Sequence, residues 1–106
     1  MSTPIENLTP EQVNAALDAG EILLVDVREP HEFAAERIAG AVNYPLSTLD
    51  PANLPSEAGK TVVLSCAGGV RSVTAANACQ AAGIDIHHHL AGGLRAWVMA
   101  GLPTER

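Results

Sequence analysis

The sequence is poor in aromatic residues, with one Trp, one Tyr and one Phe among 106 residues. Because 47% of the chain is still hydrophobic, the core must be built mainly from Val, Ile, Leu and Ala. Cysteine is scarce as well. Two cysteines are too few for a scaffold held by disulfides, and they suit free thiols in a reducing compartment. The composition indicates an ordinary globular protein.

Basic residues are the second shortage. Six Lys and Arg stand against twelve Asp and Glu, which gives a net charge of −6. This balance argues against nucleic acid or an anionic membrane surface as the main partner, and an anionic substrate would have to be attracted locally. The first residues have no basic segment followed by an apolar one, and no hydrophobic run is long enough to span a membrane. We expect a single cytoplasmic domain over residues 1–106.

Short apolar runs alternate with amphipathic segments. The pattern predicts strands over 22–27, 41–43, 61–65 and 84–90, helices over 10–19, 31–37, 72–82 and 94–100, and a loop with one helical turn over 47–59. Thr9, Pro10 and Gln12 form a helix start with a capping box. The run at 22–27 is continuously apolar, as in a strand buried on both faces. These features predict an α/β fold with a mainly parallel sheet.

A cysteine stands between the strand at 61–65 and the helix after it. Gly68 and Gly69 let the backbone curl tightly behind Cys66, and Arg71 adds a positive charge. N–H groups and the dipole of a helix N-terminus favour thiolate over thiol, and the thiolate is the nucleophile. Open parallel sheets also hold their reactive centres at the carboxyl ends of strands. We interpret residues 66–72 as an anion-binding loop around a reactive cysteine. Its other members are Ala67, Val70 and Ser72.

Several of these residues have a simpler interpretation. A cysteine after a strand is often a small buried hydrophobe, which the glycines and Arg71 disfavour for Cys66 but which fits Cys79. Arg71 could be only a surface charge at a helix end. Asp26 and Arg28 follow a buried strand, and we expect an ion pair or hydrogen bonds that hold neighbouring loops, with a place in the substrate pocket as the alternative.

A run of three histidines raises the question of a metal site. Side chains of His87, His88 and His89 would alternate between the faces of a strand and could not converge on one ion, and no other Cys or His has ligand spacing with them. We expect a solvated strand end and no metal. Trp97 shares a helix with Leu94 and is expected to anchor the core.

Three blocks of the sequence resemble the rhodanese domains. Residues 26–29 (Asp-Val-Arg-Glu), 32–33 (Glu-Phe) and 38–45 (Ile-Ala-Gly-Ala-Val-Asn-Tyr-Pro) resemble their DVRE…EF…I-x-G-A-x-N-x-P signature. Residues 66–72 resemble their C-x-x-G-x-R-S active loop, and residues 90–103 resemble their closing L-x-G-G…W…G-x-P segment. The blocks fall in the order of the family and cover nearly the whole chain, so together they are highly specific.

The resemblance implies a central parallel sheet of about five strands with helices on both faces. It also implies a single-domain thiosulfate sulfurtransferase that carries sulfur as a persulfide on Cys66 and needs no cofactor. Cys66 and Arg71 would be the catalytic residues, with Arg71 helping to capture the anionic donor and to support the leaving sulfite. The partners would be a small anionic sulfur donor, a thiol or cyanide acceptor and, for some members, a protein acceptor. The loop from Cys66 to Arg71 has the six-residue length of sulfurtransferases, whereas related dual-specificity phosphatases and arsenate reductases have one residue more.

Two other functions stay open at this point. The chain could be a sulfur-carrier or partner-binding module that turns over only within a complex, although the intact Cys66 argues against a non-catalytic one. It could also be a cysteine-dependent phosphatase or arsenate reductase, which the loop length disfavours. Because Ala67 and Val70 are neutral, Arg71 is the only charged side chain of the loop, and we expect modest affinity for thiosulfate.

Overall fold

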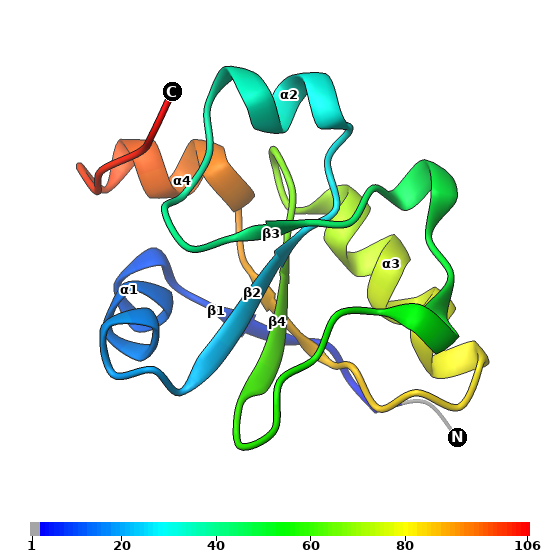
Figure 1. Ribbon diagram of the computed structural model, residues 1–106. Helices are drawn as coiled ribbons and strands as arrows, with labels where there is room; N and C mark the ends of the chain where they lie inside the picture. Colours follow the sequence, from blue (N-terminus) through cyan, green and yellow to red (C-terminus); the bar gives the residue numbers. More distant parts are fainter. Residues whose placement is uncertain (1–2) are drawn as a thin grey trace.

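The computed structural model describes residues 3–106 and has one parallel sheet of five strands with helices on both faces (Figure 1). The strands lie in the order β1-β5-β4-β2-β3 across the sheet. Their bounds are Glu6–Leu8 for β1, Ile22–Asp26 for β2, Val42–Asn43 for β3, Thr61–Ser65 for β4 and His88–Leu90 for β5. The predicted α/β class and parallel sheet are therefore confirmed.

The centre of the sheet is buried on both sides. β2 and β4 pair along their full length. Leu24 and Val63 belong to one core cluster, and Val25 and Leu64 belong to the other. None of these four side chains has exposed surface. Because successive side chains of a strand point to opposite faces, a strand with a core on each side needs a continuous apolar run, as the sequence has.

Helices complete the two layers around the sheet. They are α1 (Pro10–Asp18), α2 (Pro30–Ala35), α3 (Val70–Ala81) and α4 (Gly93–Met99), with short 3-10 turns at Leu46–Thr48 and Pro51–Asn53. Val13 of α1 and Trp97 of α4 pack in one core, and Ala75, Ala76 and Cys79 of α3 pack in the other. α2 has no buried residue and lies above the carboxyl ends of β2 and β4 in Figure 1.

The local predictions agree with the structure where sequence rules act within a few residues. The Thr9 side chain accepts from the Gln12 N–H at 3.1 Å and the Gln12 side chain accepts from the Thr9 N–H at 2.9 Å, so the capping box is confirmed. The predicted strand at 61–65 is β4. Among residues 3–106 no helix is both long enough and apolar enough to cross a membrane.

Two strands depart from the prediction. The sequence did not indicate β1, which has three residues and is stabilised as a strand by its pairing with β5. The predicted strand at 84–90 is wrong for its first half, because β5 begins only at His88. The carbonyl of Ile86 accepts instead from the Gln80 side chain at 3.0 Å. Because β1 pairs with its outer edge, β5 lies inside the sheet, between β1 and β4.

Candidate active site

The cysteine loop lies at the carboxyl end of β4 and runs directly into α3. Gly69 precedes α3 with a φ of 96°, a left-handed conformation that suits glycine. The start of α4 supports the loop from the other side. The N–H groups of Leu94 and Arg95 donate to the carbonyls of Cys66 at 2.8 Å and Ala67 at 3.0 Å. The loop is thus held between two helix starts.

The sulfur of Cys66 lies between two N–H donors and the hydroxyl of Ser72, whose oxygen can accept from the thiol. The N–H of Gly69 approaches it to 3.1 Å, the N–H of Ser72 to 3.3 Å and the hydroxyl of Ser72 to 3.5 Å. Burial by itself raises the pKa of this thiol, but hydrogen bonds from the Ser72 hydroxyl and from the N–H groups of Ser72, Gly69 and Gly68 outweigh it and leave the pKa below its ordinary value. The loop therefore favours a thiolate at this position.

Arg71 points to α2 and not to open solvent. Its guanidinium makes two hydrogen bonds to the carboxylate of Glu32, at 2.7 and 2.9 Å. Hydrogen bonding to Glu32 raises the pKa of Arg71, and the same contact lowers the pKa of Glu32 from 4.5 to about 2. The positive charge that the sequence places in the loop is therefore largely neutralised by a carboxylate 39 residues earlier.

Another arginine beside the loop is unpaired. Of the six Lys and Arg side chains, Arg95 is the one that forms no ion pair with any residue between 3 and 106. Arg95 lies in the first turn of α4, and its own N–H donates to the Ala67 carbonyl. The sequence carries no local signal for this placement, because only the fold brings residue 95 next to residue 67.

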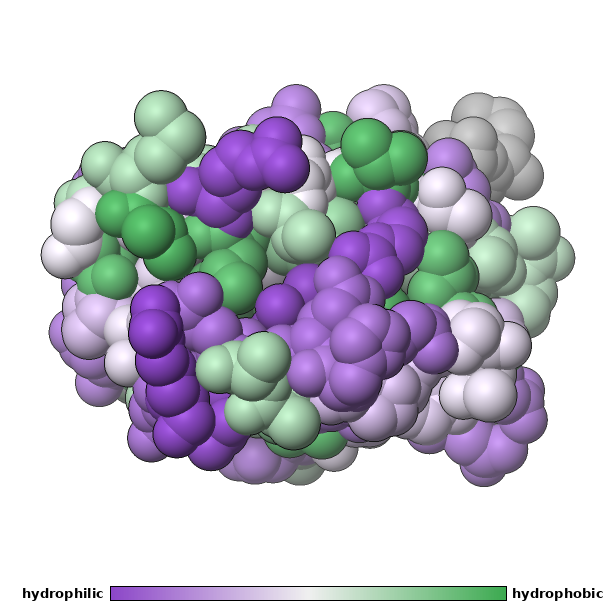
Figure 2. Space-filling model, turned by 90° about the horizontal axis from the view of Figure 1, so that it is seen from above, coloured by the Kyte–Doolittle hydropathy of each residue, from purple (hydrophilic) through white to green (hydrophobic). Residues whose placement is uncertain are grey.

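A groove of about 320 Å³ adjoins the loop. Its lining is Glu36, Ala67, Leu94, Arg95, Val98 and Met99. Two exposed hydrophobic side chains line it, because Met99 is 81% exposed and Val98 is 48% exposed. Figure 2 looks down on this end of the molecule and shows hydrophobic side chains gathered over α4, next to strongly hydrophilic ones. The groove offers an apolar wall beside the guanidinium of Arg95, which is unpaired among residues 3–106.

Asp26 and Arg28 support the site from below. They form a buried ion pair of 2.8 Å, with both residues 4% exposed. The guanidinium of Arg28 also donates to the carbonyls of Glu36 at 2.7 Å and Glu32 at 3.4 Å. The pair therefore fixes the segment that carries Glu32, in line with the structural role predicted for it.

His89 reaches the site through Ser72. Its Nδ1 lies 2.8 Å from the Ser72 Oγ, and its Nε2 lies 2.6 Å from the Oδ1 of Asn7 on β1. The expectation of a solvated strand end is wrong for this residue, which is 3% exposed. β1 covers β5 on one edge, so a side chain of β5 that faces α3 is enclosed. The available signal in the sequence for the burial of His89 was its position beside the hydrophobic residue Leu90. A buried imidazole needs hydrogen-bond partners, which Ser72 and Asn7 supply.

The other two histidines lie next to carboxylates. The Nε2 of His88 is 2.9 Å from the carboxylate of Glu6, and the Nδ1 of His87 is 3.0 Å from that of Asp85. Ligand atoms of Glu6, His87 and His88 come within 4.8 Å of one another, closer than alternation along a strand predicts, because His87 precedes β5. Each imidazole already has a carboxylate partner, so we assign His87 and His88 to these two contacts. The absence of a metal stays a prediction.

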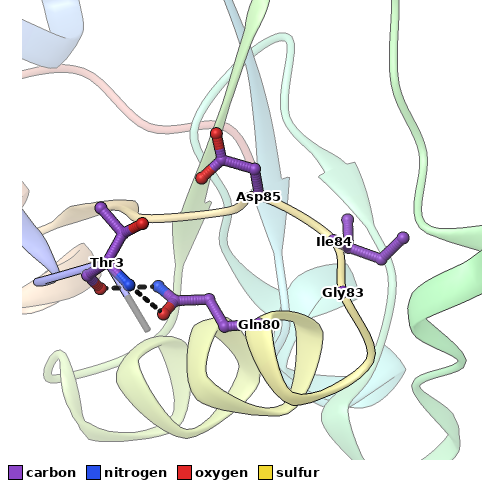
Figure 3. A pocket seen from close by; sticks show the side chains of 5 residues that line it. All are labelled: Thr3, Gln80, Gly83, Ile84 and Asp85. Carbon is purple, nitrogen blue, oxygen red and sulfur yellow. Dashed lines mark hydrogen bonds between the residues drawn. The ribbon is translucent and has the colours of Figure 1, made fainter. Parts of the chain in front are cut away.

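A polar cavity of about 170 Å³ lies at the far end of α3 from the cysteine loop (Figure 3). Thr3, Gln80, Gly83, Ile84 and Asp85 line it. The Gln80 amide accepts from the Thr3 N–H at 2.8 Å and donates to the Thr3 carbonyl at 2.9 Å. This contact holds Thr3 against the end of α3, and the described residues that line the cavity include no cysteine or histidine.

The remaining candidates are core residues. Cys79 has no exposed surface and packs beside Ala75 and Ala76, and burial raises the pKa of its thiol. Trp97 is 2% exposed and donates from its Nε1 to the Pro103 carbonyl at 2.8 Å. The predicted core roles of Cys79 and Trp97 are confirmed.

Comparison with known proteins gives consistent matches. The model of a family described as Rhodanese-like domain matches residues 9–100. An uncharacterized protein of Synechocystis sp. is 44% identical over 97 residues, which cover 92% of this chain and 54% of that protein. A probable adenylyltransferase/sulfurtransferase of Mycobacterium tuberculosis is 39% identical over 95 residues, covering 85% of this chain and 24% of that protein. The chain thus spans about half of the first relative and a quarter of the second.

The fold has a solved counterpart as well. A crystal structure of a thiosulfate sulfurtransferase from Pseudomonas aeruginosa superposes with a TM-score of 0.84 at 30% identity, and the match covers 96% of this chain and 20% of that one. The matched family region contains β2, the cysteine loop, His89 and α4.

Proposed function

The chain belongs to the family of rhodanese-like domains, and on this premise we propose that it transfers sulfane sulfur through a persulfide on Cys66. The donor in this proposal is thiosulfate or a similar small anion, and the acceptor is cyanide or a thiol, including a thiol on a protein. The observation that carries the proposal is the pair of N–H donors, from Gly69 and Ser72, within 3.3 Å of the Cys66 sulfur, since these stabilise a negative sulfur.

In the first half-reaction the Cys66 thiolate attacks the outer sulfur of thiosulfate. A new S–S bond forms to Cys66 while the S–S bond of the donor breaks, and sulfite leaves with the bonding electron pair. The charge is conserved, because a thiolate and a dianion give a persulfide anion and sulfite dianion. The terminal sulfur stays within reach of the loop N–H groups from Ala67 to Ser72, which suit its charge.

In the second half-reaction the acceptor attacks the terminal sulfur. Cyanide yields thiocyanate, and a thiolate yields its persulfide, while the Cys66–S bond breaks and returns the thiolate of Cys66. Because the enzyme is covalently modified between the two steps, ping-pong kinetics are expected. The chemistry needs no metal or organic cofactor. A reducing compartment such as the cytoplasm would keep Cys66 free for the reaction.

Arg71 and Arg95 have different roles in this proposal. Arg71 holds the loop against α2 and supports the anionic donor only weakly, because Glu32 neutralises it. Arg95 has no ion pair within the described part of the chain and lines the groove next to Ala67, so we assign to it the attraction of the incoming anion. The groove also gives an apolar thiol acceptor a surface to lie on.

The two alternative functions differ in measurable ways. A carrier module would form the persulfide but discharge it slowly to small acceptors. A phosphatase or arsenate reductase would need room for a tetrahedral oxyanion, and the six residues from Cys66 to Arg71 favour a single sulfur atom.

Intact-mass spectrometry of the purified protein before and after thiosulfate tests the proposal. We expect one added sulfur atom on the wild type, none on Cys66→Ser, and loss of that sulfur with thiocyanate formation when cyanide is added. Cys79→Ser is the matched control and should behave like the wild type, because Cys79 lies in the core. Absence of added sulfur on the wild type, or full activity of Cys66→Ser, would overturn the proposal.

A further inference from the structure

The thiol of Cys66 is almost completely buried. The residue is 1% exposed, and its sulfur lies near the N–H groups of Gly68, Gly69 and Ser72 and the hydroxyl of Ser72. The N–H groups can only donate. The hydroxyl oxygen of Ser72 is thus the acceptor within reach of an S–H group, and it too is buried.

The hydroxyl of Ser72 leads onward to a buried imidazole. It has one proton, and when its oxygen accepts from the thiol this proton lies towards the Nδ1 of His89, 2.8 Å away. The Nε2 of His89 faces the Oδ1 of Asn7 at 2.6 Å, and an amide oxygen can only accept. The Nε2 must therefore carry the proton of the neutral ring, which leaves Nδ1 free to accept.

No charged group competes for this imidazole among its partners. From β1 it meets Asn7, and from α3 it meets Ser72. The neighbouring residue of β5, His88, has its side chain on the other face of the sheet. It pairs there with Glu6, which lies on the same face of β1 as Leu8. Burial lowers the pKa of His89 and disfavours the imidazolium, so the ring is neutral at neutral pH and its Nδ1 can accept a hydrogen bond.

Two ion pairs lie near the sulfur. Arg71 of α3 is held by Glu32 of α2, and Asp26 of β2 is held by Arg28. Neither pair offers a free base to Cys66. A proton that leaves the sulfur inside the protein has one path through described contacts, namely Ser72 and then His89.

We propose that His89 is a positioning residue that receives the thiol proton of Cys66 through the hydroxyl of Ser72. The inference rests on the proposed function, since it explains how the nucleophile of that reaction is ionised. His89 does not touch the reacting sulfur and acts only through Ser72. Asn7 accepts from the Nε2 of His89 and so fixes the tautomer and orientation of the ring.

The proton balance is closed within the chain. The S–H bond of Cys66 breaks as an O–H bond forms on Ser72, and the original O–H bond of Ser72 breaks as an N–H bond forms on Nδ1 of His89. The products are a thiolate and an imidazolium, so the net charge of the site does not change. Ser72 then donates to the thiolate while its oxygen accepts from His89, an arrangement that favours the attacking state of the sulfur.

The pH dependence of alkylation by iodoacetamide, measured without any sulfur donor, tests this inference. His89→Asn keeps an acceptor near Ser72 but cannot take a proton. We expect it to raise the apparent pKa of Cys66 and to lower the alkylation rate at pH 7 by about tenfold. Asn7→Asp places a carboxylate at Nε2, stabilises the imidazolium and should shift the profile in the opposite direction, to a lower apparent pKa. Asn7 is exposed, so this variant should fold.

His87→Gln is the matched control, because it removes a neighbouring histidine that does not contact Ser72. Its profile should coincide with that of the wild type. If His89→Asn is folded by circular dichroism and its profile is unchanged, or if Asn7→Asp does not lower the apparent pKa, the proposal is overturned. Asn7→Asp alone decides if His89→Asn does not fold. Because alkylation needs no sulfur transfer, shifted profiles together with absent persulfide would overturn the proposed function and leave the role of His89 standing.

Discussion

Arg71 and Glu32 are joined by two hydrogen bonds of 2.7 and 2.9 Å, which tie the cysteine loop to α2. The contact explains why a short helix without a buried residue keeps its place beside the site. It also changes what Arg71 can do, because a paired guanidinium adds little net charge to an incoming anion. The pair is better understood as a support of the loop than as an anion trap.

Replacing Glu32 by Gln should destabilise the protein at neutral pH and not at low pH. The folded pKa of Glu32 is about 2 and its ordinary value is 4.5, so its contribution is present above 4.5 and is lost as the pH falls towards 2. We expect a loss of about 1 to 2 kcal/mol at pH 7, reduced by solvent screening because both side chains are partly exposed.

Urea denaturation of the wild type and of Glu32→Gln at pH 7 and pH 3 measures this effect. The difference in unfolding free energy between them should shrink at pH 3. Glu57→Gln is the control, since Glu57 pairs with Lys60 at the surface and should change stability little. A difference that is the same at both pH values would contradict the role given to the pair.

Gly93→Ala should disrupt the cysteine loop. Gly93 has a φ of 58°, and a Cβ there would lie within 2.8 Å of the Ala67 carbonyl, next to the Cys66 carbonyl oxygen. We expect the free energy of unfolding to fall by about 3 kcal/mol or more and sulfur transfer to be lost. Gly101→Ala separates the two causes, because Gly101 has a φ of 77° and open space around it. It should cost only about 1 kcal/mol in thermal or urea unfolding and keep activity. Equal losses in both variants would rule out the close approach as the cause.

Features that depend on neighbouring residues were predictable from the sequence. The Thr9–Gln12 capping box and the strand at 61–65 follow from rules that act over a few positions, and the structure has both. The cysteine loop belongs to the same class, because a strand, two glycines and a helix start are contiguous in the chain. Its placement at the carboxyl end of β4 then follows from the parallel sheet.

Features that depend on distant pairing were not predictable. β1 is a strand because β5 lies beside it, and its own three residues do not indicate this. The burial of His89 depends on that missing strand, so the histidine run was expected at a solvated end. Arg95 meets Ala67 across 28 positions through the contact between α4 and the loop, as the hydrogen bond between them shows. Each of these requires the tertiary structure.

The two cysteines should differ sharply in reactivity. Hydrogen bonds leave the pKa of Cys66 below its ordinary value, whereas burial raises the pKa of Cys79, which has no exposed surface. Iodoacetamide at pH 7 should therefore modify one thiol in the native protein and two in urea. Peptide mapping should place the native label on Cys66, and Cys66→Ser should take none. Native labelling of Cys79 would contradict its assignment to the core.

Arg95→Ala should weaken the use of thiosulfate through KM and leave kcat nearly unchanged. Arg95 is exposed and unpaired among residues 3–106, so it acts on the approach of the anion and does not contact the Cys66 sulfur. An exposed charge of this kind is worth about 1 kcal/mol at most, which corresponds to a rise in KM of about two- to fivefold. Raising the salt concentration should raise the KM of the wild type and affect the variant less, because ions screen the contact.

Lys60→Ala makes the same change in net charge and is the matched control. Lys60 precedes the amino end of β4, whereas the cysteine loop follows the carboxyl end of the same strand. Lys60 pairs with Glu57. If KM rises only for Arg95→Ala, the attraction is local to the groove. If both variants raise KM equally, the overall charge of −6 governs the approach of the donor, and Arg95 loses the role assigned to it.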